Sequence, residues 1–261
     1  TISVDGKLST KLISGLTTKD PVLEEVITKE KAAFEAILQQ PLGEALVPLY
    51  SKHPETGERL VRKQECNVAN LVADSFRKVL NTDIALVNGG GIRRDIPKGI
   101  FTYKDILELL PFGNMCAVKE VTGQQILDAL EMGVYELPAE SGGFLHVSGL
   151  TYVVDATIPT SVVRDEKGNF IKVDGAYRVQ EVKVAGKPLV LDKVYSVASN
   201  SYILTHGGNG MTMFNSGKLL SEDNLTDADA VIEYVQNHLN AKVGEEYKKP
   251  LGEGRISIKL P

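Results

Sequence analysis

A glycine run at the end of an apolar segment constrains the fold of this chain more than any other feature. The apolar residues 84–87, typical of a buried strand, run directly into Asn88-Gly89-Gly90-Gly91-Ile92-Arg93. Glycine adopts backbone angles closed to other residues and removes side chains that would keep a ligand away. The run therefore predicts a strand that ends in a binding turn, with Arg93 placed for a phosphate or a carboxylate. A tight turn followed by a surface arginine would explain the same residues equally well.

Composition limits the class of protein. The chain has 261 residues, of which 43% are hydrophobic and 24% charged, as is typical of a soluble globular protein. Its net charge of -5 argues against a nucleic-acid-binding surface, and no apolar stretch is long enough to span a bilayer. The chain begins at Thr1 without a signal peptide or an initiator Met, so we expect a fragment or a processed product. Cys66 and Cys116 are interpreted as buried thiols in preference to one disulfide bridge.

Hydrophobic periodicity predicts helices early in the chain and strands later. Asp20-Pro21 is expected to open a helix that ends near residue 40, after an extended lead-in or strand pair over residues 1–18. Further helices are predicted to begin at four polar residues: Asn67, Thr102, Thr122 and Thr226. Strands are predicted at 144–155, 178–184, 194–199 and 255–260. This order indicates an α+β fold with mixed sheets and not a regular βαβ series.

The common catalytic and cofactor motifs are absent. A dinucleotide-binding glycine pattern that started at Gly89 would need a third glycine where the chain has Arg94. The two Gly-Lys pairs do not complete a phosphate-binding loop, the four histidines lack metal-ligand spacing, and no nucleophile elbow is present. The sequence therefore predicts neither a bound cofactor nor a self-sufficient hydrolase.

Four loop segments carry residue types that hold a flat, phosphorylated ligand. They contribute Arg62, then Asn88 and Arg93, then Phe112 between Pro111 and Gly113, and finally Tyr202 before a second glycine-rich loop at 206–210. Two aromatic rings on either side of a base contribute about 1–3 kcal/mol each. Arginine supplies paired phosphate contacts, and asparagine offers both a donor and an acceptor. Taken singly, each ring is explained slightly better by simple core packing.

Five segments in this order resemble the C-terminal domain of the 5′-nucleotidase family, which also includes UDP-sugar hydrolases and 2′,3′-cyclic phosphodiesterases. The segments are 61–74, 88–93, 110–114, 144–150 and 207–210. The resemblance implies a layered α/β/β/α domain with mixed sheets over residues 42–261. Residues 1–41 resemble the end of the family's N-terminal domain followed by the connecting helix.

The resemblance also implies a function. Members of the family are two-domain enzymes in which an N-terminal metallophosphoesterase domain holds two divalent metals. The C-terminal domain binds the nucleoside or nucleotide and delivers its phosphate to those metals. The Asp-x-His and Gly-Asn-His-Glu signatures of the metal domain are absent from this chain. By the same resemblance we expect a periplasmic, cell-surface or secreted protein.

Position by position, the resemblance assigns a substrate-binding set. Phe112 matches one aromatic of a base clamp, and Asn88 matches the asparagine that contacts the base. Arg62 and Arg93 match arginines on the phosphate or ribose side, and Gly91 belongs to the same set. Two positions depart from the family pattern.

The first departure is Asn209, which stands where a carboxylate usually binds the ribose hydroxyls. The second is a loop that is one residue longer, so that Tyr202 or Ile203 fills the second clamp position; Tyr202 is favoured because isoleucine cannot stack. The leading hypothesis is the substrate-binding half of a nucleotide hydrolase, inactive when isolated. The alternatives are a stand-alone nucleoside-binding module and an interaction domain with a degenerate pocket.

Overall fold

The computed structural model describes residues 19–260. The chain divides into two compact units, and the boundary in the sequence falls between Gln40 and Pro41. The first unit contains helix α1 (Pro21–Leu38), the helix predicted from the sequence. Asp20 caps it by accepting hydrogen bonds from the backbone N–H groups of Val22 and Leu23 at 2.9 and 3.2 Å. The lead-in expected over residues 1–18 lies outside the described residues. That the first unit is the end of another domain stays a prediction.

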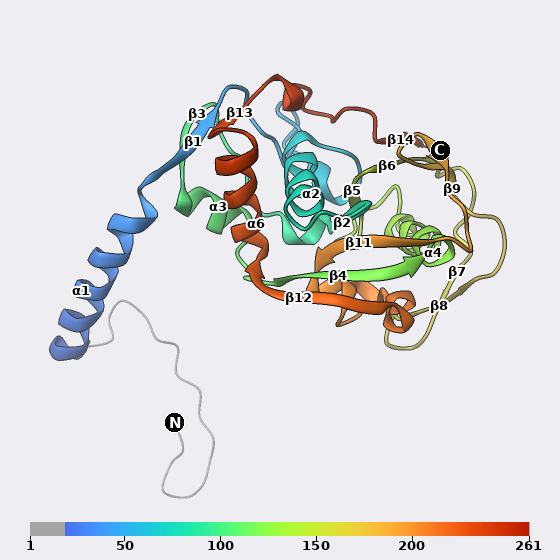
Figure 1. Cartoon of the computed structure of the whole chain (residues 1–261), viewed down its shortest axis with the longest axis horizontal. Coiled ribbons are helices and arrows are strands. Elements are labelled where there is room, and N and C mark those ends of the chain that lie inside the picture. The colour runs from blue at the N-terminus through green and yellow to red at the C-terminus, as the bar shows by residue number, and fades with distance from the viewer. Residues whose placement is uncertain (1–18, 261) are drawn as a thin grey trace, which may run out of the picture. The chain divides into compact units, whose positions relative to one another are not determined.

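A five-stranded mixed sheet forms the centre of the second unit (Figure 1). Its strands, in order across the sheet, are β12 (Lys218–Thr226), β4 (Met115–Thr122), β11 (Val194–Asn200), β2 (Ile84–Asn88) and β5 (Leu145–Ser148). Strand β2 runs parallel to β11, whereas the other neighbouring pairs are antiparallel. The prediction of mixed sheets is confirmed.

Alternate residues of β2 pack on opposite faces of this sheet. Ala85 and Val87 belong to one apolar cluster, formed with helices of the first face. Those helices are α2 (Asn67–Val79), α3 (Tyr103–Leu109) and α6 (Asp227–Glu233). Ile84 and Leu86 belong to a second cluster, formed with α4 (Gly123–Val134) and a further sheet. Because both faces are covered, all five residues of β2 are buried.

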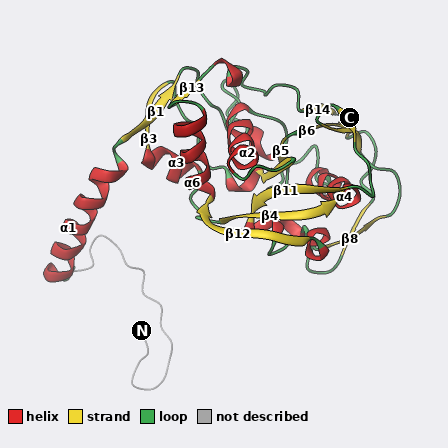
Figure 2. Ribbon diagram, in the orientation of Figure 1, coloured by secondary structure: helices red, strands yellow, loops and turns green. Residues whose placement is uncertain are grey.

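Three smaller sheets complete the unit (Figure 2). The four-stranded sheet consists of β10 (Lys187–Pro188), β9 (Val179–Val184), β6 (Leu150–Asp155) and β14 (Ile256–Lys259). The other two are β13 (Lys242–Val243) with β1 (Pro41–Ala45) and β3 (Gly99–Thr102), and the pair β7 (Val162–Arg164) and β8 (Phe170–Val173). The fold is the layered α/β domain with mixed sheets that the sequence predicts.

Side-chain capping explains where most of the helices begin. Reciprocal capping boxes open three helices, at Thr102, Thr122 and Thr226. The predicted cap at Asn67 is wrong, because Asn67 is the first residue of α2 and its side chain makes no cap bond. Its amide instead donates to the carbonyls of Pro48 and Tyr247 at 2.9 and 2.8 Å. Asn67 is thus a buried connection between distant loops.

Both cysteines are buried and neither forms a disulfide, which confirms the favoured interpretation. Burial raises the pKa of the Cys66 thiol to about 12, so this group stays protonated at neutral pH. Among the helices of residues 19–260, none combines the length and the apolar character needed to cross a membrane.

Candidate functional site: a pocket where strand β2 ends

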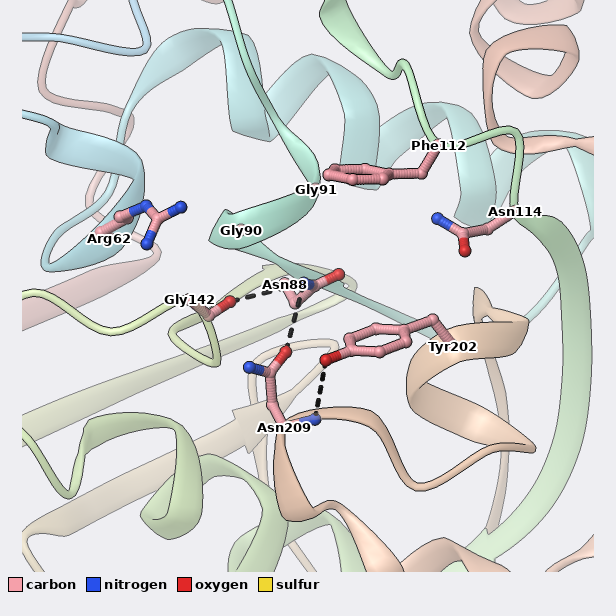
Figure 3. A pocket seen from close by; sticks show the side chains of 9 residues that line it. All are labelled: Arg62, Asn88, Gly90, Gly91, Phe112, Asn114, Gly142, Tyr202 and Asn209. Atoms are coloured by element: carbon pink, nitrogen blue, oxygen red, sulfur yellow. Dashed lines mark hydrogen bonds between the residues drawn. The ribbon is translucent and has the colours of Figure 1, made fainter. Parts of the chain in front are cut away.

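A pocket of about 450 Å³ opens where β2 ends, a volume within the range of small-molecule sites (Figure 3). Nine residues line it: Arg62, Asn88, Gly90, Gly91, Phe112, Asn114, Gly142, Tyr202 and Asn209. Six of the seven residues predicted from the sequence are among them, and Arg93 is the exception. The fold therefore brings together segments that are up to 147 positions apart in the chain, from Arg62 to Asn209.

Two exposed aromatic rings form opposite walls of this pocket. The Phe112 side chain comes from the loop after α3 and is 59% exposed, and Tyr202 comes from the short helix α5 (Ser201–Leu204) and is 41% exposed. Figure 3 shows the two rings on either side of the open space. Core packing does not explain either ring. Ile203 is fully buried, so Tyr202 is the member of that pair which reaches the pocket.

The glycine run, Gly89–Gly91, packs closely against backbone atoms of other segments as well as lining the pocket. A Cβ atom on Gly89 would lie 1.6 Å from the carbonyl oxygen of Val61, and one on Gly90 would lie 2.9 Å from that of Gly142. None of the three glycines has a positive φ, so close packing is what requires glycine at positions 89 and 90. At Gly91 the nearest atom to an added Cβ would be Asn88 Oδ1 at 3.4 Å, an ordinary contact.

A chain of amide hydrogen bonds forms the floor of the pocket. Asn200 Oδ1 accepts from the backbone N–H of Ile203 at 3.0 Å, and Asn200 Nδ2 donates to Asn88 Oδ1 at 3.0 Å. Asn88 Nδ2 lies 3.4 Å from Asn209 Oδ1 and donates to it (Figure 3). Asn209 has a left-handed backbone, φ 54°, which asparagine tolerates, and its N–H donates to the hydroxyl of Tyr202 at 3.3 Å.

Arg62 supplies a free positive charge on one side. Arg62 is the last residue of a short 3₁₀ turn, Leu60–Arg62. The carbonyl of Arg62 accepts a hydrogen bond from the backbone N–H of Ser141 at 2.8 Å, and the carbonyl of Val61 accepts one from His146 Nε2 at 2.9 Å. Burial lowers the pKa of His146 to about 4, so its imidazole is neutral. Within residues 19–260 the Arg62 guanidinium makes no hydrogen bond or ion pair, whereas Arg59 pairs with Glu140.

The electrostatics around Arg62 favour an anion. Burial lowers the pKa of Arg62, and the like charges of Arg59 and Arg93 lower it further, while Glu140 acts in the opposite direction. A bound anion would offset this repulsion between like charges.

Arg93 lies beside the pocket, behind the clamp ring. Its guanidinium carbon is 5.7 Å from the centroid of the Phe112 ring, within the range of a cation–π contact. Its Nη1 also donates to the carbonyl of Gly90 at 3.3 Å. Arg93 therefore supports two walls of the pocket, Phe112 and Gly90.

Sequence reasoning missed Gly90, Asn114 and Gly142 as lining residues. The side chain of Asn114 is fixed by a 3.2 Å hydrogen bond to Asp227, whose pKa burial raises to about 6. Its position two residues after Phe112 was one available signal. Gly142 had no such local signal, because its role depends on a distant contact, in which Gly90 N–H donates to Gly142 O at 2.9 Å.

The described part of the chain offers no metal centre. Among residues 19–260 no group of three or more His, Cys, Asp or Glu side chains could hold an ion. The two metals implied by the family do not fit these residues.

Comparison with known proteins points to one family. The family model "5′-nucleotidase, C-terminal domain" matches residues 43–216. The trifunctional nucleotide phosphoesterase protein YfkN of Bacillus subtilis is 29% identical over 258 residues, covering 95% of this chain and 16% of that protein. The human 5′-nucleotidase is 27% identical over 260 residues, covering 95% of this chain and 42% of that protein.

A solved structure supports the same relation. The 5′-nucleotidase precursor from Thermus thermophilus is 32% identical, with a TM-score of 0.72, and the match covers 91% of this chain and 43% of that one. The chain thus spans less than half the length of these relatives.

Proposed function

Because the chain belongs to the 5′-nucleotidase family, whose C-terminal domain it matches over residues 43–216, we propose that it is the substrate-binding half of a two-domain nucleotide phosphohydrolase. It binds the base and ribose of a nucleoside or nucleotide. The partner is an N-terminal metallophosphoesterase domain of the same polypeptide, which holds two divalent metals and receives the phosphate. We further propose a periplasmic, cell-surface or secreted location.

The pair of exposed rings is the observation that carries this proposal. Phe112 and Tyr202 lie on opposite walls of the pocket, and Asn88 and Asn209 lie between them on its floor (Figure 3). A planar base fits between two rings, where stacking contributes about 1–3 kcal/mol per ring. The floor amides supply donors and acceptors to the base edge and the ribose.

Arg62 is the group that we assign to the anionic part of the substrate. Its guanidinium is unpaired within the described residues and lies to one side of the two rings (Figure 3). Guanidinium groups bind phosphate oxygens through two parallel hydrogen bonds, which fixes orientation as well as affinity.

Calorimetric titration of the purified chain tests the proposal. Adenosine and AMP should bind saturably with one site per chain, and ribose 5-phosphate should bind far more weakly because it lacks the stacked base. Phe112→Ala together with Tyr202→Ala should abolish adenosine binding. Absence of adenosine binding at about 1 mM, the level of a weak −4 kcal/mol complex, would count against the proposal.

A stand-alone nucleoside-binding module is the second candidate. It would use the same pocket and the same two rings, without delivering a phosphate to a metal domain. The sequence of the intact gene distinguishes the two, since only the first candidate requires a metallophosphoesterase domain upstream of Thr1.

A further inference from the structure

A second cleft, of about 500 Å³, shares no described lining residue with the pocket at the end of β2. It lies where the last turn of α2 meets the turn between β5 and β6 and the turn between β9 and β10. Its volume is within the range of small-molecule sites. Six of its described lining residues carry a charge: Asp74, Arg77, Lys78, Asp83, Lys183 and Arg255.

Positive charge is in excess in this cleft. Asp74 accepts two hydrogen bonds from Arg255, both at 2.7 Å, so these two charges offset each other. Among the described lining residues, Asp83 is the carboxylate that remains, and it accepts from the backbone N–H and the hydroxyl of Ser196 at 2.9 Å. The three other cations therefore share the cleft with one carboxylate that is already hydrogen-bonded, and this excess favours an anion.

Two contacts hold the half-buried side chain of Arg77 in place. Its Nε donates to the hydroxyl of the buried Ser148 at 2.7 Å, and that hydroxyl donates in turn to Asp74. Its stem lies against Gly149, where an added Cβ would be 2.8 Å from Arg77 Cδ. Among residues 19–260 the two terminal nitrogens of this guanidinium have no hydrogen-bond or ion-pair partner. They can therefore donate two parallel hydrogen bonds to an oxyanion.

Two exposed lysines add positive charge beside Arg77. Lys78 follows it on α2 and has no ion-pair partner within the described part of the chain. Lys183 on β9 lies 3.7 Å from Glu181 in an ion pair whose two side chains are both exposed, and such pairs contribute little to stability. Lysine binds phosphate as a flexible point charge, so both lysines can adapt to a ligand that Arg77 positions.

The cleft offers no ring on which a nucleobase could stack. Tyr234 is the one aromatic residue among its described lining residues, and it is only 7% exposed. The ligand that fits this cleft is therefore a compact group with several negative charges, such as a chain of linked phosphates.

We propose that this cleft is a second binding site, which takes a diphosphate or triphosphate group. The Arg77 guanidinium donates paired hydrogen bonds to one phosphate, and Lys78 and Lys183 offset the charge of the next. A free inorganic chain and the tail of a nucleotide present the same oxygens to these residues. The proposal does not depend on the proposed function, since the two sites share no described lining residue.

Calorimetric titration of the wild-type chain with phosphate, pyrophosphate and triphosphate tests the site. Pyrophosphate should bind saturably, and the affinity should rise from phosphate to triphosphate and fall as salt is added. Arg77→Gln should weaken pyrophosphate binding about tenfold or more, the loss expected when charge-assisted hydrogen bonds are removed.

ADP distinguishes a free phosphate chain from a nucleotide tail. It is titrated into the double variant Phe112→Ala with Tyr202→Ala, in which stacking in the pocket at the end of β2 is lost. Binding as tight as that of pyrophosphate indicates that the phosphates alone are recognised, and tighter binding indicates a nucleotide. Either result supports the site only if Arg77→Gln weakens it.

Lys183→Glu tests the site even if Arg77→Gln does not fold, because the Lys183 side chain is exposed. It should weaken pyrophosphate binding by a similar factor. Lys172→Glu is the matched control, since Lys172 is an exposed lysine on β8, outside the cleft, in a 3.2 Å ion pair with the exposed Asp174. It should leave binding unchanged, and thermal melts should show that both variants fold.

Three results would overturn the proposal. The first is that pyrophosphate does not bind at about 1 mM, the level of a weak complex. The second is that Lys172→Glu weakens binding as much as Lys183→Glu, because the loss would then reflect net charge alone. The third is that Arg62→Gln abolishes binding while Arg77→Gln does not, because pyrophosphate would then occupy the pocket at the end of β2.

Discussion

Asp74 on α2 and Arg255 beside β14 form a two-pronged ion pair, with both nitrogen–oxygen distances at 2.7 Å. The side chains are only 14% and 19% exposed, and the pair joins segments 181 positions apart. Ser148 and Tyr247 donate to the same carboxylate. The pair therefore links the helical face of the domain to the four-stranded sheet.

Replacing Asp74 should destabilise the fold strongly. Asp74→Asn leaves Arg255 partly buried without its counter-charge, and we expect a loss of about 3 kcal/mol in the free energy of unfolding. Chemical denaturation at pH 7 measures this loss. Glu245→Gln, which removes an exposed ion pair with Lys248, is the control and should change stability little.

The contribution of Asp74 should also depend on pH. Burial raises the pKa of Asp74, but the hydrogen bonds from Arg255, Ser148 and Tyr247 outweigh it and hold the pKa below its ordinary value of 3.8. A depressed carboxyl pKa stabilises the fold above the unfolded value, and the stabilisation is lost as pH falls through the folded pKa. The difference between wild type and Asp74→Asn should therefore shrink below about pH 4. A difference that is constant down to pH 2 would contradict this.

Because the Phe112 side chain is exposed, its replacement should affect ligand binding but not folding. Phe112→Ala should weaken adenosine binding by about 1–3 kcal/mol through lost stacking, while the melting temperature changes little. Phe34→Ala removes a ring of similar exposure, 60% against 59%, from α1 and should leave binding unchanged. If Phe112→Ala instead cost about 3–5 kcal/mol of stability, the ring would belong to the core.

Ribose recognition should be looser than in relatives that carry Asp at position 209. Charge-assisted hydrogen bonds contribute about 1.5–3 kcal/mol against about 1 for neutral ones. The affinity gap between adenosine and 2′-deoxyadenosine should thus be small in the wild type and wider in Asn209→Asp. Parallel titrations of both nucleosides measure it, and an unchanged gap would show that Asn209 does not contact the ribose hydroxyls.

The chain by itself should hydrolyse no nucleotide above background. Its described residues lack a ligand set that could lower the pKa of a metal-bound water. A phosphate-release assay with AMP and each of several divalent metals tests this. Saturable, metal-dependent release from the pure chain would refute the prediction.

The sequence predicted those features of the fold that depend on residues close together in the chain, such as the starts of helices. The capping boxes at Thr122 and Thr226 involve residues three positions apart, so the sequence alone reveals them. Strand β4 was missed because Lys119 interrupts its apolar pattern. Lys119 is buried, and its Nζ donates to the carbonyl of Phe214 at 3.0 Å, a partner 95 positions away.

The candidate site divides in the same way. Phe112 could be predicted as exposed because proline and glycine flank it. The direction of the Arg93 side chain could not be predicted. The backbone N–H of Arg93 donates to the carbonyl of Leu109 at 2.9 Å, and only the folded chain defines this contact. Gly142 escaped for the same reason, because its role comes from contact with Gly90.

The contact of Gly89 with Val61 has a consequence for how substrate preference can diverge within such proteins. At one wall of the pocket, the backbone of Gly89 packs directly against the backbone of Val61. Any side chain at position 89 would therefore push the neighbouring residues Arg62 and Asn88 apart. Selection therefore has few ways to resize that wall. The side chains at 112, 202 and 209 reach the pocket from separate segments, so replacements there can change its shape one at a time. Tyr202 and Asn209 are both of this replaceable kind.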